Sequence, residues 1–184
     1  ANGSPTYSTS VVKFGTHSVT LNGTNQFFTW GSSAGMSSSI GGSDFTFEMW
    51  VYLNAAPGTF TMLSSGITPS NKAFEWKITS TGMVFNYSND GTNSTTLTSD
   101  SITWNTGQWY HVELDRSGNN FYMFRDGVLV STGLTITGNI ITPSGNAGGI
   151  GRDWSSTNFF NGNIDEFSMW LGYALHTSNF TPPS

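Results

Sequence analysis

Alternation of apolar and other side chains is the dominant pattern along the chain, and it predicts strands rather than helices. The clearest strand covers residues 44–53, with the sequence DFTFEMWVYL. One face carries four large apolar side chains, those of Phe45, Phe47, Met49 and Val51. The opposite face is mixed and carries Thr46, Glu48, Trp50 and Tyr52. We expect the first face to lie in a core and the second to form a partly apolar outer surface.

Two hairpins in sequence are predicted between residues 109 and 133, WYHVELDRSGNNFYMFRDGVLVSTG. Their strands cover residues 109–116, 121–125 and 128–130, with a turn at 117–120. The pair Asp126-Gly127 is the strongest short hairpin signal, because both central positions of a type I′ turn need φ > 0. Alternation in the first strand separates two sets of side chains, Tyr110, Val112 and Leu114 on one face and His111, Glu113 and Asp115 on the other.

Shorter strands fill much of the remaining chain. Residues 17–21 and 26–30 are predicted to pair as a hairpin around 22–25, and residues 73–79 and 83–87 to pair across 80–82. Residues 59–65 and 162–171 are further strands, and residues 174–178 favour one helical turn. About a dozen short strands separated by turns predict an all-β, two-sheet antiparallel sandwich. Residues 1–12 are polar and lack a period, so they are interpreted as an arm or linker before a single domain at 13–184.

Composition narrows the class of protein. With 184 residues, the chain is long enough for one domain with a sizeable core. Charged residues make up 9%, the net charge is −5 and no Lys/Arg run occurs, which argues against a nucleic-acid partner. The apolar runs are too short for a transmembrane helix. The absence of Cys removes disulfides, thiol catalysis and Cys-based metal sites. A surface rich in hydroxyl and amide groups indicates an extracellular or particle-surface protein.

Three segments together resemble a known family. They are DFTFEMWVY, the hairpin sequence at 109–133, and GGIGRDWSSTNFFNGNIDEFSMW near the end. In this combination they are similar to laminin-G-like, concanavalin A-like domains, which implies a two-sheet jelly roll across residues 14–181. The tail GYALHTSNFTPP resembles the end of such modules in virion proteins of tailed phages, with His176 in place of the expected Tyr. The tail therefore implies a location on a virion surface.

Glycoside hydrolysis is the enzymatic activity to test first, because a related enzyme group shares this fold. The reaction needs two carboxyl groups about 5–9.5 Å apart across a sugar site. On one strand these occur as E-x-D-x-E or E-x-D-x-x-E, and this sequence contains neither. The closest approaches are Glu113 with Asp115, and Asp165 with Glu166. Adjacent Asp165 and Glu166 point to opposite faces of a strand, whereas Glu113 and Asp115 share a face with His111, with Glu48 on a nearby strand. The alternative is that His111 and Glu113 form hydrogen bonds within the sheet, and we expect no enzyme.

The resemblance also implies one Ca²⁺ as the only cofactor, either structural, between the N- and C-terminal strands, or at the rim. Asp165 matches the family position whose side chain ligates the ion, with carbonyl groups near Asn22 and Gly23 opposite. Carboxylates and carbonyl oxygens are the ligands that calcium prefers. The alternative role for Asp165 is to cap a strand edge through hydrogen bonds. The three His residues show no zinc spacing.

Glycan binding needs an exposed aromatic ring with polar groups beside it. Trp154 next to Asp153, in a loop rich in Ser and Asn, is the best candidate. A second polar loop contains Asn89, Asp90 and Asn93. The alternative for Trp154 is a lid over one end of the sandwich. The remaining tryptophans considered are assigned to core or outer-face packing, namely Trp50, Trp76, Trp109 and Trp170.

Three hypotheses for function follow. The first is a non-catalytic module on a virion surface, as a capsid decoration, fibre or tail-associated protein that contacts glycans or neighbouring virion proteins. The second is a secreted or cell-surface carbohydrate-binding module of a larger bacterial protein. The third is a glycosidase. No nucleic-acid or membrane partner is expected, and an oligomer within a particle is left open.

Overall fold

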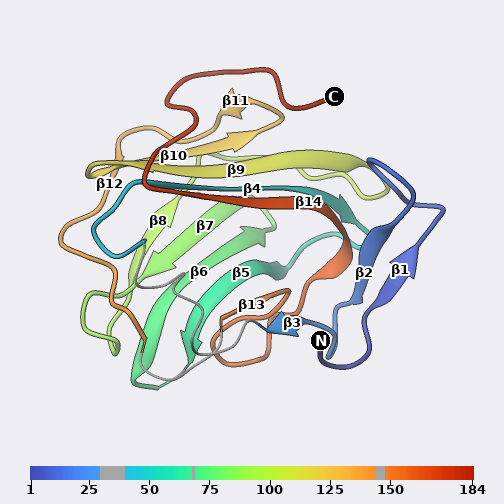
Figure 1. Ribbon diagram of the computed structural model, residues 1–184, viewed down its shortest axis with the longest axis horizontal. Helices are drawn as coiled ribbons and strands as arrows, with labels where there is room; N and C mark the ends of the chain where they lie inside the picture. The colour runs from blue at the N-terminus through green and yellow to red at the C-terminus, as the bar shows by residue number, and fades with distance from the viewer. Residues whose placement is uncertain (30–39, 68, 144–147) are drawn as a thin grey trace.

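Two antiparallel sheets pack face to face in the computed structural model, which describes residues 1–29, 40–67, 69–143 and 148–184 (Figure 1). The larger sheet has the order β1 (Thr6–Ser8), β2 (Ser18–Asn22), β14 (Asn161–Leu171), β4 (Phe45–Leu53), β9 (Trp109–Ser117), β10 (Asn120–Arg125) and β11 (Val128–Leu129), and β12 (Leu134–Thr135) also pairs with β10. The six-stranded sheet has the order β3 (Phe28–Thr29), β13 (Gly149–Ile150), β5 (Thr59–Ile67), β6 (Asn71–Thr79), β7 (Gly82–Tyr87) and β8 (Thr95–Thr98). The predicted all-β jelly-roll sandwich is thus confirmed.

The core lies between the sheets and follows the predicted alternation. Phe45, Phe47, Met49 and Val51 of β4 are fully buried. Phe47 stacks on Phe74 of the opposite sheet, with ring centroids 5.4 Å apart. The larger sheet therefore turns the other faces of β4 and β9 away from the core, and these faces form its outer side.

The β10–β11 turn has the expected geometry. Asp126 and Gly127 have φ values of 53° and 75°, as a type I′ turn requires. A side chain at Gly127 would also collide with the carbonyl oxygen of Phe180. This turn therefore fixes both the hairpin and the path of the C-terminal segment, residues 172–184. In Figure 1 that segment, in dark red, leaves the end of β14 and passes back over β9, β10 and β11.

Two predicted local structures are wrong, and both errors come from contacts between distant residues. The strands near 17–21 and 26–30 do not form a hairpin, because β2 lies in the larger sheet and β3 in the smaller one; Trp30 lies outside the described residues. The side chain of Asn22 accepts hydrogen bonds from the backbone N–H groups of residues 24–26 and so turns the chain between sheets. The predicted helical turn at 174–178 is absent, since the N–H groups of Leu175 and His176 donate to Asp115 instead.

The first residues of the chain contribute an edge strand. β1 lies within residues 1–12, the predicted arm, and pairs with β2 from Thr6 to Ser8. Its side chains are largely exposed, with Tyr7 at 69%. Among the residues described, no helix is both long and apolar enough to cross a membrane.

Candidate binding site on the outer face of the larger sheet

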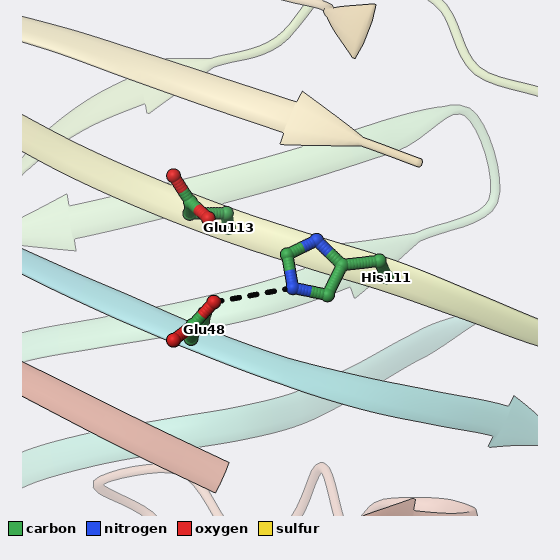
Figure 2. Close-up of side chains that lie close together, drawn as sticks. All are labelled: Glu48, His111 and Glu113. Atoms are coloured by element: carbon green, nitrogen blue, oxygen red, sulfur yellow. Dashed lines mark ion pairs between the residues drawn. The ribbon is translucent and has the colours of Figure 1, made fainter. Parts of the chain in front are cut away.

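A chain of polar side chains crosses the outer face of the larger sheet. Figure 2 shows Glu48 on β4 facing His111 and Glu113 on the neighbouring β9. Antiparallel register brings them together, because Glu48 lies opposite Glu113 and Trp50 lies opposite His111. The Nε2 atom of His111 is 3.3 Å from Oε2 of Glu48. His111 is 1% exposed, so this pair is held in a largely dry environment.

The C-terminal segment covers the next part of this row. Glu113 and Asp115 are both 0% exposed. Nδ1 of His176 lies 2.7 Å from Oε1 of Glu113, and the N–H of Leu175 donates to Asp115 over 2.9 Å. The hydroxyl group of Thr46 also donates to Asp115, to the Oδ1 atom that accepts from Leu175. The segment thus replaces water as the partner of two carboxyl groups that alternation had placed on one face.

Burial changes the protonation of these two carboxyl groups. Loss of hydration, followed by the proximity of Asp115, raises the pKa of Glu113 far above its ordinary value. Loss of hydration also raises the pKa of Asp115. Oε2 of Glu113 and Oδ2 of Asp115 are buried, and neither atom accepts a hydrogen bond from an N–H or hydroxyl group. One proton shared between the two carboxyl groups accounts for both observations.

Beside this buried row lies an open cavity of about 330 Å³. Its lining comes from β4, β9, β14 and both ends of the chain, and consists of Phe14, Glu48, Trp50, His111, Glu166, Ser168 and Pro183. A hydrogen bond with His111 is the main cause that lowers the pKa of Glu48, so this carboxylate is ionised at neutral pH. The cavity therefore combines aromatic walls with a negatively charged floor.

An irregularity in β14 shapes the cavity wall. The register between β14 and β4 shifts between Asp165 and Ser168, as in a β-bulge. Glu166 in this bulge has φ = 48°, a left-handed conformation that is uncommon for a residue with a side chain. Bulges redirect side chains and are frequent beside functional sites. Here the bulge places an exposed carboxylate at the cavity.

Two exposed aromatic side chains, Trp170 and Tyr173, form an aromatic platform next to the cavity. They are 40% and 47% exposed, and their ring centroids are 6.1 Å apart. Nε1 of Trp170 donates to Oε1 of Glu48 over 3.0 Å, which joins the platform to the cavity floor. Core or outer-face packing was predicted for Trp170. The sequence pattern does not predict that its ring stays exposed. Tyr173 is not among the residues predicted for a site, and its nearness to Trp170 in the sequence was the available signal.

Trp154 and Asp153 lie on the other side of the sandwich. The expected exposure of Trp154 is wrong, because the side chain is 7% exposed and its indole N–H donates to the carbonyl oxygen of Ser65. Its backbone N–H donates to Glu75, which points away from the core of the six-stranded sheet. Asp153 accepts hydrogen bonds from residues 155, 157 and 158 and so organises its own loop. Trp154 is therefore a cover over the six-stranded sheet.

The second predicted polar loop follows β7 in the same sheet. Asp90 accepts hydrogen bonds from the backbone of Thr92 and Asn93 and from the side chain of Asn93. These bonds lower the pKa of Asp90. Asn89 donates to the carbonyl oxygen of Thr137. The three residues are exposed but belong to a different sheet from the platform. Ligand binding by Asn89, Asp90 and Asn93 stays a prediction.

The expected calcium geometry at Asp165 is wrong. Register places Asn22 opposite Asn161, four residues from Asp165, which is about 13 Å along a strand. The carboxylate instead accepts hydrogen bonds from the backbone N–H groups of Lys13, Phe14 and Glu166. N–H donors point positive charge at the carboxylate, whereas calcium would need oxygen ligands there. Asp165 thus fastens the segment before β2 to the bulge of β14, close to the predicted capping role.

Within the part of the chain that the structure describes, two groups of side chains have donor atoms close enough to hold a metal ion. One comprises Glu48, His111 and Glu113, and the other Glu113, Asp115 and His176. Within each group the donor atoms lie within 4.8 Å of one another. Imidazole nitrogen in both groups fits a transition metal better than Ca²⁺, which prefers oxygen.

The fold and the open outer face define a lectin-like jelly-roll domain, and sequence comparison agrees. Residues 22–177 match the family model described as the concanavalin A-like lectin/glucanases superfamily, and the chain belongs to it. A comparison with curated proteins finds no match.

Solved structures share the fold at low sequence identity. Domain 4 of AbnA, a GH43 extracellular arabinanase from Geobacillus stearothermophilus, in complex with arabinotriose, is 16% identical with a TM-score of 0.68, over 94% of this chain and 77% of that one. The CBM40 of Ruminococcus gnavus IT-sialidase, bound to α2,3 sialyllactose, is 16% identical with a TM-score of 0.67, over 87% and 91%. The binding domain of Paraclostridial Mosquitocidal Protein 1 is 10% identical with a TM-score of 0.71, over 95% of this chain and 44% of that one.

Proposed function

We propose that this protein is a non-catalytic glycan-binding domain whose ligand lies on the outer face of the larger sheet. The observation that carries the proposal is the aromatic platform of Trp170 and Tyr173 beside a polar cavity. A sugar ring presents an apolar face that packs on an aromatic ring, and its hydroxyl groups need a few well-placed polar partners. Glu48, Ser168 and Glu166 offer such partners at the cavity.

Similar structures support a glycan as the ligand. Domain 4 of the arabinanase was solved with arabinotriose, and the sialidase module with α2,3 sialyllactose. At 16% identity, the similarity to these two structures supports the fold alone. The binding role in this chain is supported by its own aromatic platform.

The arrangement of carboxyl groups supports binding without catalysis. Glu113 and Asp115, the nearest approach to a hydrolase motif, are fully buried beneath the C-terminal segment. Their outward hydrogen bonds go to His176 and to backbone N–H groups, so a substrate has no access to them in this conformation. A general acid must reach the glycosidic oxygen directly.

We propose a particle or cell exterior as the setting, with a virion surface first and a secreted bacterial module second. Two features of the sequence support this, the phage-like tail at 172–183 and a charged fraction of only 9%. Neighbouring virion proteins would then be further partners. Antibody labelling of intact source particles under the electron microscope tests this setting. We expect label on the particle exterior, and label only on cells or in the medium would favour the second alternative.

The binding role is tested with Trp170→Ala and Tyr173→Ala on an oligosaccharide panel. We expect each substitution to weaken binding by about tenfold, equal to 1.4 kcal/mol, because each removes one stacking surface. Tyr7→Ala is the matched control, since Tyr7 is 69% exposed but lies on the edge strand β1. Its binding should equal that of the parent. Equal binding by all three variants, with unchanged melting temperatures, would disprove a role for the platform.

A further inference from the structure

The lining of the outer-face cavity combines negatively charged carboxylates with aromatic side chains. Its lining supplies two carboxylates, Glu48 and Glu166. Trp50 and Phe14 form aromatic walls, with ring centroids 6.0 Å apart and planes at 75°. Carboxylates attract a cation, and the negative face of an aromatic ring does the same.

A cation of the protein itself lies against the aromatic wall. Nζ of Lys13 is 3.8 Å from the centroid of the Trp50 ring and 5.3 Å from that of Phe14. Trp50 is 8% exposed, so this ammonium group and its neighbours cover the ring. Lys13 is held there by its backbone, because its N–H donates to Asp165, while its side chain is only half-buried. The ammonium group therefore marks a position at which a cation is stabilised.

Hydrogen bonds hold the Glu48 carboxylate in place at the cavity. His111 and Trp170 both donate to Glu48, from Nε2 over 3.3 Å and Nε1 over 3.0 Å, and fix its orientation. Glu166 is exposed and is directed by the bulge of β14. These two groups come from adjacent strands, so an ammonium group between them would be held from two sides.

From this geometry we infer that the site takes a glycan bearing a free primary amine, an amino sugar, with its ammonium group between the carboxylates and Trp50. This inference rests on the proposed glycan-binding function and adds the class of sugar. The ring of the amino sugar packs on the aromatic platform, which adjoins Glu48. A sialylated glycan would bring its carboxylate towards Glu48 and Glu166, and like charges repel. The ligand class therefore differs from that of the sialidase module with the same fold.

The test compares three probes by calorimetry, namely a β-1,4-linked glucosamine oligosaccharide, its fully N-acetylated counterpart and α2,3 sialyllactose. N-acetylation removes the positive charge and keeps the sugar ring. We expect the amine form to bind about tenfold more tightly than the acetylated form, from one charge-assisted contact. Raised salt should reduce this preference, since the pair is partly open to solvent. Sialyllactose should bind most weakly.

Three variants locate the preference. Glu166→Gln keeps an exposed residue in the bulge and should remove most of the preference for the amine. Asp100→Asn is the control, because Asp100 is also exposed but follows β8 of the six-stranded sheet, and this variant should keep the preference. Lys13→Ala keeps the N–H bonded to Asp165 and should tighten binding of the amine, because it vacates the Trp50 face.

The outcomes separate the two proposals. Equal affinity for the amine and acetylated probes, with binding still lost in Trp170→Ala, would overturn the amino-sugar inference and leave the glycan-binding function standing. Weaker amine binding by Lys13→Ala would also overturn the inference. No binding of any oligosaccharide by the folded parent would overturn both.

Discussion

Single residues in this protein carry roles that their local sequence explains only in part. Asp126-Gly127 is the clearest case, since the dipeptide predicts the turn and the structure gives both residues positive φ. The same glycine also touches the C-terminal segment, where its carbonyl oxygen accepts a hydrogen bond from Phe180 over 2.9 Å. A contact with Phe180, 53 positions further along the chain, thus adds to the local preference of Asp126-Gly127 for a turn.

A pair of glycine substitutions separates these two contributions. Gly118 has φ = 60° with no neighbouring atom in the way, so Gly118→Ala costs only the left-handed backbone, about 1 kcal/mol. At Gly127 an alanine also displaces the Phe180 backbone, and we expect Gly127→Ala to cost about 3 kcal/mol in free energy of unfolding. Urea unfolding of both variants measures the difference. Equal losses would mean that the C-terminal segment does not constrain this turn.

At the level of elements, the C-terminal segment acts as part of the larger sheet's outer layer. His176 stacks on Phe180 with centroids 3.6 Å apart, and Phe180 packs on Phe124, which is fully buried. The segment therefore completes the burial of β9 and β10. Residues 1–12, by contrast, add an exposed edge strand of three residues.

Truncation at either end distinguishes these two elements. Deleting residues 172–184 removes the backbone bonds to Asp115 and the packing of Phe180, and we expect a loss of about 3 kcal/mol. Deleting residues 1–12 removes an exposed edge strand and a few hydrogen bonds to Ser18, Gln26 and Phe27. The melting temperature of this variant should stay within a few degrees of that of the parent. Scanning calorimetry of both deletions decides this. A larger loss from the N-terminal deletion would show that residues 1–12 are integral to the domain.

For the whole molecule, stability should depend on pH in opposite directions for two groups of carboxyls. Hydrogen bonds, first that from His111, lower the pKa of Glu48. Burial alone would raise the pKa of Asp153, but its hydrogen bonds outweigh burial and lower it. The stability that these two carboxylates contribute is therefore present at neutral pH and is lost in acid. Burial raises the pKa of Glu113 above its ordinary 4.5 and that of Asp115 above 3.8. The folded protein therefore binds more protons than the unfolded chain above these values, and stability falls as pH rises.

The Glu113→Gln variant tests the alkaline side of this profile. An amide cannot ionise, so melting temperatures between pH 5 and about 9 should fall less steeply than in the parent. Deleting residues 172–184 should flatten the same range, because water then reaches both carboxyl groups. A parent and a Glu113→Gln variant with parallel profiles would mean that this carboxyl keeps an ordinary pKa.

The sequence by itself determined the two-sheet antiparallel sandwich, the long strands and the β10–β11 turn. Alternation and turn chemistry are local signals, and they specify a strand and its buried face without knowledge of its partners. The same alternation placed His111, Glu113 and Asp115 on one face and Glu48 on a nearby strand, which the structure confirms.

Only the tertiary structure decided which of those faces a ligand can reach. The C-terminal segment buries Glu113 and Asp115, and the indole of Trp154 is closed over the six-stranded sheet, while Trp170 stays open. Likewise, register decided that Asp165 faces backbone N–H groups rather than the carbonyls of Asn22 and Gly23. Exposure and register depend on residues far away in the chain, and for that reason no local pattern encodes them.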